Sequence, residues 1–174
     1  ERIYFEELIK DREDSYRLME KQSMSAIEDL VVQKYSEKAH FIHELLQNAD
    51  DTKATEAHFE LNKNGLRFWH NGSEHFSIIS PQLENDKKYR GPNGHVNAIV
   101  AIGNSTKGRD GSQEYKIGKF GIGFKAVFQY TKTPHVYDDC FSFYIRNLII
   151  PVLLDKDDSK RKQVKCGYGE FYKA

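Results

Sequence analysis

The chain has 174 residues, of which 39% are hydrophobic and 30% charged, as is typical of one globular domain with a sizeable core. Basic and acidic residues number 26 each, so the net charge of zero gives no overall attraction toward nucleic acid or an anionic membrane. No apolar run approaches the ~20 residues of a membrane-spanning helix, which argues against a membrane partner.

Cysteine usage and the chain ends add two expectations. Cys140 and Cys166 lie far apart without metal-ligand spacing and are interpreted as free thiols in a reducing, cytoplasmic setting. The seven histidines are also scattered without metal spacing, so solvated or structural roles are expected for them. The chain begins without Met and ends abruptly, so we expect a piece of a longer protein.

The periodicity of apolar residues changes along the chain. Helical spacing comes first, two-residue alternation follows from Thr55, and the polar stretch 80–95, with two prolines and two glycines, is expected to be a loop or insertion. Helices followed by hairpins favour an α+β fold, with helices on one face of a mixed or antiparallel sheet. The predicted helices are 4–19, 25–34, 40–50, 97–102 and 124–129, and the predicted strands are 57–61, 66–69, 134–137 and 141–145.

The helix over 40–51 carries a polar stripe. At ~100° per residue, Glu44, Asn48 and Asp51 share an arc of about 60° opposite an apolar stripe. An ordinary solvated face is the simplest interpretation. An Asn oxygen also suits Mg²⁺, and a Glu one turn earlier can accept a proton from water that attacks a phosphate.

A glycine cluster, Gly118 to Phe124, supplies a candidate phosphate site. Its three glycines let backbone N–H groups approach an anion, and a helix that begins near Gly123 adds its N-terminal dipole. Lys119 and Lys125 would add positive charge. The cluster is neither a P-loop nor a dinucleotide-binding fingerprint, and a glycine-rich turn is the alternative.

These elements together resemble the GHKL superfamily of gyrase, the heat-shock chaperone, histidine kinases and MutL, in a sacsin-like form. The resemblance covers about 35–145: Glu44 to Asp51 resembles the N-box, His70-Asn71-Gly72 with Phe76 the first glycine motif, and Gly118 to Phe124 the second. Gly103 to Lys107 resembles the lid segment. The resemblance implies a Bergerat-type two-layer α/β sandwich, one domain over 1–174 with a helical N-terminal extension of about 1–34, and a lid of about 79–116 over the nucleotide.

The resemblance also implies roles for single residues. Glu44 would be the general base of an ATPase, Asn48 would bind Mg²⁺, and Lys107 with the second glycine motif would hold the phosphates of ATP. The implied ATP-binding residues are Asn48, Asp51, His70, Asn71, Gly72, Phe76, Asn104, Ser105, Thr106, Lys107, Gly118, Lys119, Phe120, Gly121, Ile122, Gly123 and Phe124.

Two departures from the superfamily pattern stand out. His70 replaces the Asp that accepts from the adenine amino group, so a neutral imidazole, Asn71 or a water would have to serve. The late Gly-Thr pair is missing after Ile145, so that strand either lies beyond Ala174 or is replaced by 166–171.

The expected function is therefore Mg-dependent ATP hydrolysis that drives conformational change in a larger protein, with an adenine nucleotide and the remaining domains as partners. A Glu base argues against a histidine kinase. A nucleotide sensor with little turnover, the ATPase domain of a DNA-handling protein, and an interaction domain without nucleotide are the alternatives. Whether ATP closes a dimer, as in several members of the superfamily, is left open by the sequence.

Overall fold

The computed structural model describes residues 1–20, 40–101, 123–154, 165–166 and 169–170. The predicted helix 25–34 and the polar stretch 107–116 lie outside these ranges. The described elements are α1 (Arg2–Glu20), α3 (His40–Asp51), β1 (Ala57–Asn62), β2 (Gly65–His70), α4 (Pro81–Asn85), α5 (His95–Ile99), the 3₁₀-helix η1 (Gly123–Gln129), β3 (His135–Tyr137), β4 (Ser142–Arg146), β5 (Ile150–Leu153), β6 (Lys165–Cys166) and β7 (Gly169–Glu170). None of the helices in these ranges is long and apolar enough to cross a bilayer.

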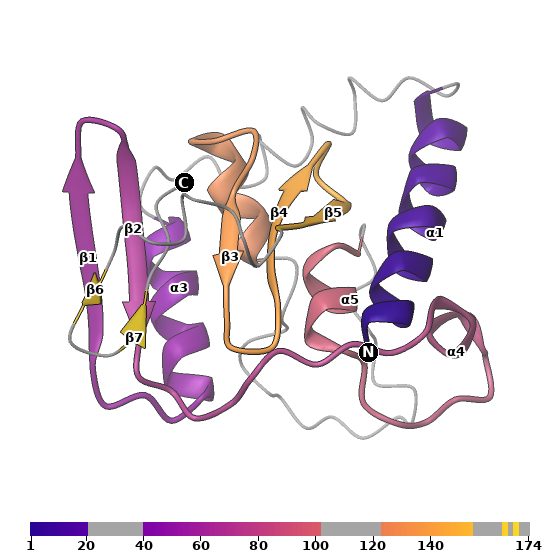
Figure 1. Cartoon of the computed structure of the whole chain (residues 1–174), viewed down its shortest axis with the longest axis horizontal. Helices are drawn as coiled ribbons and strands as arrows, with labels where there is room; N and C mark the ends of the chain where they lie inside the picture. Colours follow the sequence, from indigo (N-terminus) through magenta and orange to yellow (C-terminus); the bar gives the residue numbers. More distant parts are fainter. Residues whose placement is uncertain (21–39, 102–122, 155–164, 167–168, 171–174) are drawn as a thin grey trace.

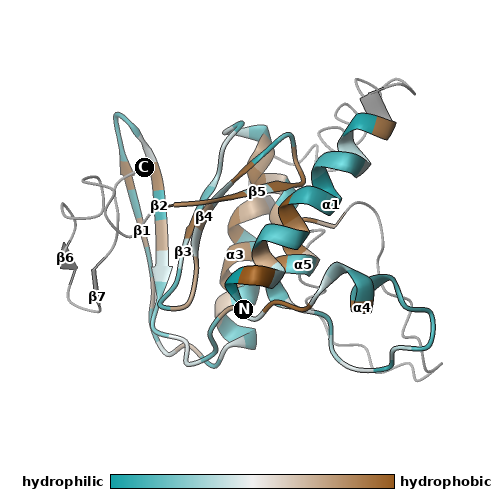
Figure 2. Ribbon diagram, turned by 45° about the vertical axis from the view of Figure 1, so that its right-hand side comes forward, coloured by the Kyte–Doolittle hydropathy of each residue, from teal (hydrophilic) through white to brown (hydrophobic). Residues whose placement is uncertain are grey.

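The strands form small antiparallel sheets. β1 pairs with β2 from Ala57 opposite His70 to Asn62 opposite Gly65, as the alternation and the turn predicted. The order β3-β4-β5 makes a second sheet, and β6 pairs with β7. The β1–β2 and β3–β4 hairpins stand next to each other with α3 and η1 behind them, and α5 lies between β4 and α1 (Figure 1); Figure 2 shows the same molecule turned by 45°. The α+β class is thus confirmed, although every described strand pair is antiparallel and the expected mixed sheet is not seen among them.

The core lies between α1, α5 and β4. Phe5 and Leu8 of α1 are fully buried and meet Val96 and Ile99 of α5 and Phe143 of β4. The ring centroids of Phe5 and Phe143 lie 5.5 Å apart, edge to face. Each such burial contributes about 1.5–3 kcal/mol. The helix that the sequence suggested as an N-terminal extension therefore supplies the centre of the core.

Part of the stretch 80–95 is more ordered than a loop. Ser80 caps α4 by accepting the Leu83 N–H at 3.3 Å, and Pro81 stands at the first helical position, which is a known start signal. The second short helix runs from His95 to Ile99 instead of over 97–102. Buried Asn97 ties it down, because its carboxamide bonds both the N–H and the C=O of Ile79. The loop interpretation holds for residues 86–94 and was wrong only for 81–85, because Ser80 and Pro81 were weighed without their roles at a helix start.

Two further elements differ from the sequence expectation. Residues 123–129 form a 3₁₀-helix in place of an α-helix. The apolar run 150–153 is the strand β5, which sequence analysis missed and which is among the most hydrophobic segments in Figure 2. β5 packs on α1, and Arg146 at the end of β4 donates to Glu13 at 2.6 Å. The first and last parts of the described core therefore hold each other in place.

Candidate functional site

Helix α3 carries the polar stripe that sequence analysis singled out. The helix ends because Lys53 takes a left-handed conformation (φ 60°), and the Ala54 N–H returns to the Ala49 carbonyl at 3.0 Å. Its face formed by Phe41 and Glu44 is turned toward η1, and the Phe41 and Tyr130 rings lie 4.7 Å apart. The apolar stripe is covered only in part, since Ala49 is buried but Ile42 and Leu46 are exposed.

The Glu44 carboxylate lies directly against Gly123, the last glycine of the second motif. A Cβ built at Gly123 would stand only 1.7 Å from Glu44 Oε2, so no side chain fits there while the carboxylate keeps its place. Gly123 is buried and Glu44 is half-buried. The structure thus brings together an acid and a glycine that are 79 positions apart in the sequence.

Gly72 makes a similar close approach at the other end of α3. A Cβ there would lie 1.9 Å from Thr52 Oγ1 and 2.8 Å from His70 Nδ1. Thr52 is buried and bonds the Ala49 carbonyl at 2.8 Å, and the Ser73 N–H donates to the Thr52 carbonyl. A glycine is therefore required for the first motif to pack on the end of α3. Sequence analysis missed Thr52, which no motif marks.

His70 has a defined hydrogen-bonding state. Its Nδ1 accepts the Gly72 N–H at 3.1 Å, which an imidazole nitrogen can do only without a proton. Burial lowers the pKa of His70, and the opposing attraction of Asp138 is the smaller effect. The ring is therefore neutral at pH 7 with its proton on Nε2. That nitrogen is a donor and does not replace the acceptor expected for an adenine amino group.

Asn71 is committed to the local fold. Its Oδ1 accepts the N–H groups of Thr55 and Glu56 at 2.9 and 3.0 Å, and its Nδ2 donates to the Thr55 hydroxyl. These bonds fasten the loop after β2 to the start of β1. The carboxamide oxygen is thus already occupied, which disfavours the idea that Asn71 accepts from a base.

The remaining predicted site residues fall into three groups. Phe76 and Phe124 pack against the hydrophobic core, so their rings serve the fold. Asn48 and Asp51 share α3 with Glu44, Asn48 half-buried and Asp51 exposed. The rest lie outside the described residues: Asn104, Ser105, Thr106, Lys107, Gly118, Lys119, Phe120, Gly121 and Ile122.

Lys125 does not serve as a phosphate ligand in this structure. Its side chain is buried and Nζ donates to the Leu148 carbonyl at 2.5 Å, above the Phe128 ring. Burial, aided by the nearby charge of Arg12, lowers the pKa of Lys125 to about 7. The positive charge that the sequence suggested at this end of the glycine cluster is therefore directed into the core.

The proposed lid begins within packed structure. Val96, Ile99 and Val100 are buried in the core, so the part of this segment around α5 contributes to it, whereas residues 82–93 are exposed or half-buried. The second part of the predicted lid, 102–116, lies outside the described residues.

The comparisons with known proteins support the sacsin-like part of the resemblance. A profile of the sacsin domain matches residues 21–145, well over half of the chain. The chain belongs to the sacsin-domain family. No solved structure matches it.

Two curated relatives are much longer than this sacsin domain. Protein NO VEIN of Arabidopsis thaliana is 36% identical over 123 residues, which cover 68% of this chain but 4% of that protein. Sacsin of Homo sapiens is 28% identical over 110 residues, which cover 62% of this chain and 2% of that protein. The chain thus spans only a small part of the relatives it matches.

Proposed function

We propose that this sacsin domain binds Mg-ATP beside α3 and hydrolyses it, with Glu44 as the general base. The observation that carries the proposal is the contact between the Glu44 carboxylate and Gly123. An acid that can take a proton from water is thereby held at the end of a glycine run suited to phosphate. The close packing of Gly72 on Thr52 supports the same assignment, because it brings the first glycine motif to the same helix.

The donors on α3 fit a magnesium ion. Asn48 lies one turn after Glu44 and offers a neutral carboxamide oxygen, and Asp51 adds a carboxylate on the same face. Mg²⁺ prefers such oxygen ligands together with phosphate oxygens. When bound, the ion would offset the charge of the phosphates.

The proposed reaction is the transfer of the γ-phosphoryl group to water. Glu44 takes one proton from the water, whose oxygen forms a bond to the γ-phosphorus. The bond from that phosphorus to the bridging oxygen breaks, and its electron pair leaves with ADP. Inorganic phosphate forms, and Glu44 returns its proton to solvent. Because the relatives are far longer, we infer that the cycle drives a conformational change in neighbouring domains.

The test is to separate nucleotide binding from turnover. Glu44→Ala and Glu44→Gln should lower the steady-state ATPase rate by about 10²–10⁴-fold, the usual contribution of a general base, while calorimetry gives a Kd for Mg-ATP close to that of the wild type. Glu74→Gln, which alters an exposed carboxylate outside α3, is the matched control and should change neither quantity.

Three outcomes would contradict the proposal in different ways. Wild-type turnover by Glu44→Ala would remove Glu44 as the base. Binding without single-turnover hydrolysis by the wild type would indicate a nucleotide sensor. A thermal midpoint that Mg-ATP leaves unchanged at saturating concentration would argue against nucleotide binding, because a ligand of the folded state must raise its stability.

A further inference from the structure

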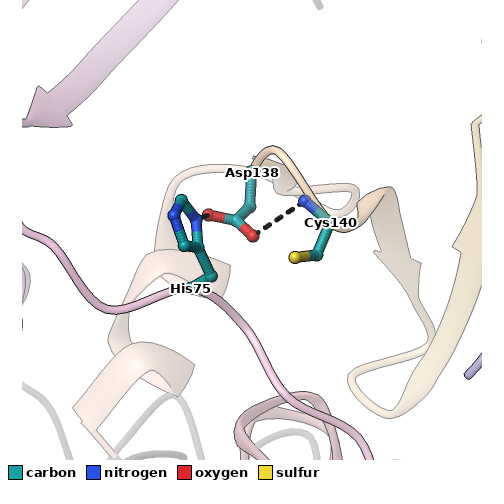
Figure 3. A group of neighbouring side chains, drawn as sticks. All are labelled: His75, Asp138 and Cys140. Atoms are coloured by element: carbon teal, nitrogen blue, oxygen red, sulfur yellow. Dashed lines mark hydrogen bonds and ion pairs between the residues drawn. The ribbon is translucent and has the colours of Figure 1, made fainter.

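The turn between β3 and β4 gathers three metal-ligating side chains from two separate segments. His75 comes from the loop after β2, and Asp138 and Cys140 come from the turn itself (Figure 3). One ligand atom from each of the three lies within 4.8 Å of the others. Sequence analysis missed this group because His75 is 63 positions away from Asp138 and no spacing pattern links them.

Asp138 is held in one orientation by the backbone. Its Oδ2 accepts the N–H of Phe76 at 3.2 Å and the N–H of Cys140 at 3.1 Å. Its Oδ1 is then directed at His75 Nδ1, 3.1 Å away. The Asp138 side chain is only 13% exposed, whereas that of His75 is 52% exposed. The carboxylate is therefore preorganised, and the solvent side of the group stays open to an entering ion.

The separation between His75 and Asp138 is close to that of two ligands of a tetrahedral ion. Zinc takes His nitrogen and Asp oxygen at about 2.0–2.2 Å, which in a tetrahedron separates these two ligand atoms by roughly 3.3 Å. The Nδ1 to Oδ1 distance of 3.1 Å is already close to that value. The Cys140 sulfur should lie slightly farther from the other two ligand atoms, because a zinc–thiolate bond is about 2.3 Å long.

We propose that His75, Asp138 and Cys140 form a binding site for a thiophilic divalent cation, Zn²⁺ foremost, with the fourth position left for water or an external ligand. An imidazole and a thiolate select zinc over Mg²⁺, which prefers oxygen ligands alone. On binding, the Cys140 thiol releases its proton to solvent and forms a sulfur–zinc bond. His75 binds through unprotonated Nδ1, and no oxidant or reductant takes part.

The electrostatics of the turn are consistent with this site. Desolvation, the charges of Asp138, Glu1 and Asp139, and a hydrogen bond to the Asp138 side chain all raise the pKa of the Cys140 thiol. The Asp138 carboxylate likewise raises the pKa of His75. Negative charge that disfavours a bare thiolate attracts a dication, so the same surroundings favour the metal-bound form. The ion would hold the loop after β2 against the β3–β4 turn. The Asp138 carboxylate already links these two segments through its contacts with His75 and Phe76.

The simpler interpretation is a capped hairpin turn with a docked histidine and no metal. It explains the two bonds to Asp138 Oδ2, the contact with His75 and the hydrogen bond between the Cys140 thiol and the Asp138 carboxylate, without using the sulfur as a ligand. A metal site requires that sulfur, which makes the cysteine the residue on which to base a test.

The experiment is a metal titration of the full chain after treatment with a chelator. Competition against a chromophoric zinc indicator should give one equivalent of bound Zn²⁺. Co²⁺ should give a thiolate-to-metal charge-transfer band in the near ultraviolet. Cys140→Ser and His75→Gln should each weaken zinc binding by at least about tenfold, and Cys140→Ser should remove the band. Cys166→Ser, which alters the other cysteine of the chain, should leave both readouts unchanged.

Zinc affinity that is equal in the wild type and Cys140→Ser would overturn the proposal, as would a band that disappears with Cys166→Ser. Absence of any saturable binding would do the same. Because Cys140 is exposed, Cys140→Ser should keep the metal-free unfolding midpoint of the wild type. His75→Gln provides a second loss of binding that leaves both thiols in place. Neither variant touches Glu44, so ATP hydrolysis and zinc binding are tested independently.

Discussion

Two regions of this sacsin domain are stabilised in different ways. The core region, made of α1, α5, β4 and β5, buries Phe5, Leu8 and Phe143 completely. In the motif region, made of α3, the β1–β2 hairpin and residues 71–76, the only described apolar side chain less than a tenth exposed is Ala49, whereas Leu61 is 81% exposed. Burial therefore stabilises the core region, while the motif region is organised by backbone contacts and polar side chains. Stability and the proposed chemistry should thus depend on different residues.

A matched pair of leucines offers the largest contrast. Leu8→Ala should cost about 2–5 kcal/mol of unfolding free energy, because it leaves a cavity in a fully packed site. Leu61→Ala, the same chemical change on the hairpin, should stay within about 0.5 kcal/mol. Urea denaturation followed by circular dichroism measures both. If both variants lost a similar unfolding free energy, the β1–β2 hairpin would be covered in solution, and the two regions would not differ in how they are stabilised.

The contact at Gly123 should separate turnover from stability. Gly123→Ala forces the Glu44 carboxylate to move, which a long flexible side chain can do at low cost. We expect the ATPase rate to fall by about tenfold or more, since a displaced base loses part of its contribution. The unfolding free energy should change by less than about 1 kcal/mol.

Gly72→Ala is the control for the Gly123→Ala variant. There the added methyl group meets both Oγ1 and Cβ of Thr52, a short side chain that cannot swing away. This variant should therefore lose stability as well as activity. An unchanged ATPase rate for Gly123→Ala would show that the position of the carboxylate is unimportant.

The smallest expected effect concerns buried Lys125. Its pKa in the folded state is about 7, against 10.5 as the ordinary value, so between these pH values the unfolded chain binds more protons. The unfolding free energy should therefore rise as pH increases from 7 toward 10. Below pH 7, the full cost of burying the protonated Lys125 amine should be present. Lys125→Met should raise the unfolding free energy at pH 7 by about 1 kcal/mol, less any loss from the bond to the Leu148 carbonyl.

The measurement for Lys125 is chemical denaturation at several pH values. The wild type and Lys125→Met should converge as pH rises, because deprotonation removes the cost of the buried amine. Parallel curves across this range would mean that Lys125 keeps an ordinary pKa in the fold.

Much of the fold was accessible from the sequence because local signals were strong. The helix 40–51 and the two hairpins followed from the periodicity and the turn residues, and the structure confirms them. The helices α4 and α5 were missed or misplaced because each is five residues long and depends on tertiary bonds such as those of Asn97. Strand β5 was missed because a short apolar run has no period that distinguishes a strand from a buried turn.

For the candidate site, one predicted proximity is seen in the structure and several contacts were not predicted, while the roles of the residues stay predictions. The motif order placed Glu44 and Gly123 in one site, and the structure brings them together. The direction of Lys125 could not be predicted, because it depends on the Leu148 carbonyl across the core. The tautomer of His70 depends on the Gly72 N–H, and the group around Asp138 depends on how two distant loops dock.

The packing of α1 has a practical consequence for trimming this domain. The family match spans residues 21–145, yet Phe5 and Leu8 precede it and β5 follows it. A fragment cut at the limits of homology would expose the inner faces of Phe143 and Val96 to water and invite aggregation. About 130 residues separate the end of α1 from β5, the strand on which it packs. During synthesis this part of the core can therefore form only late, after β5 has been made.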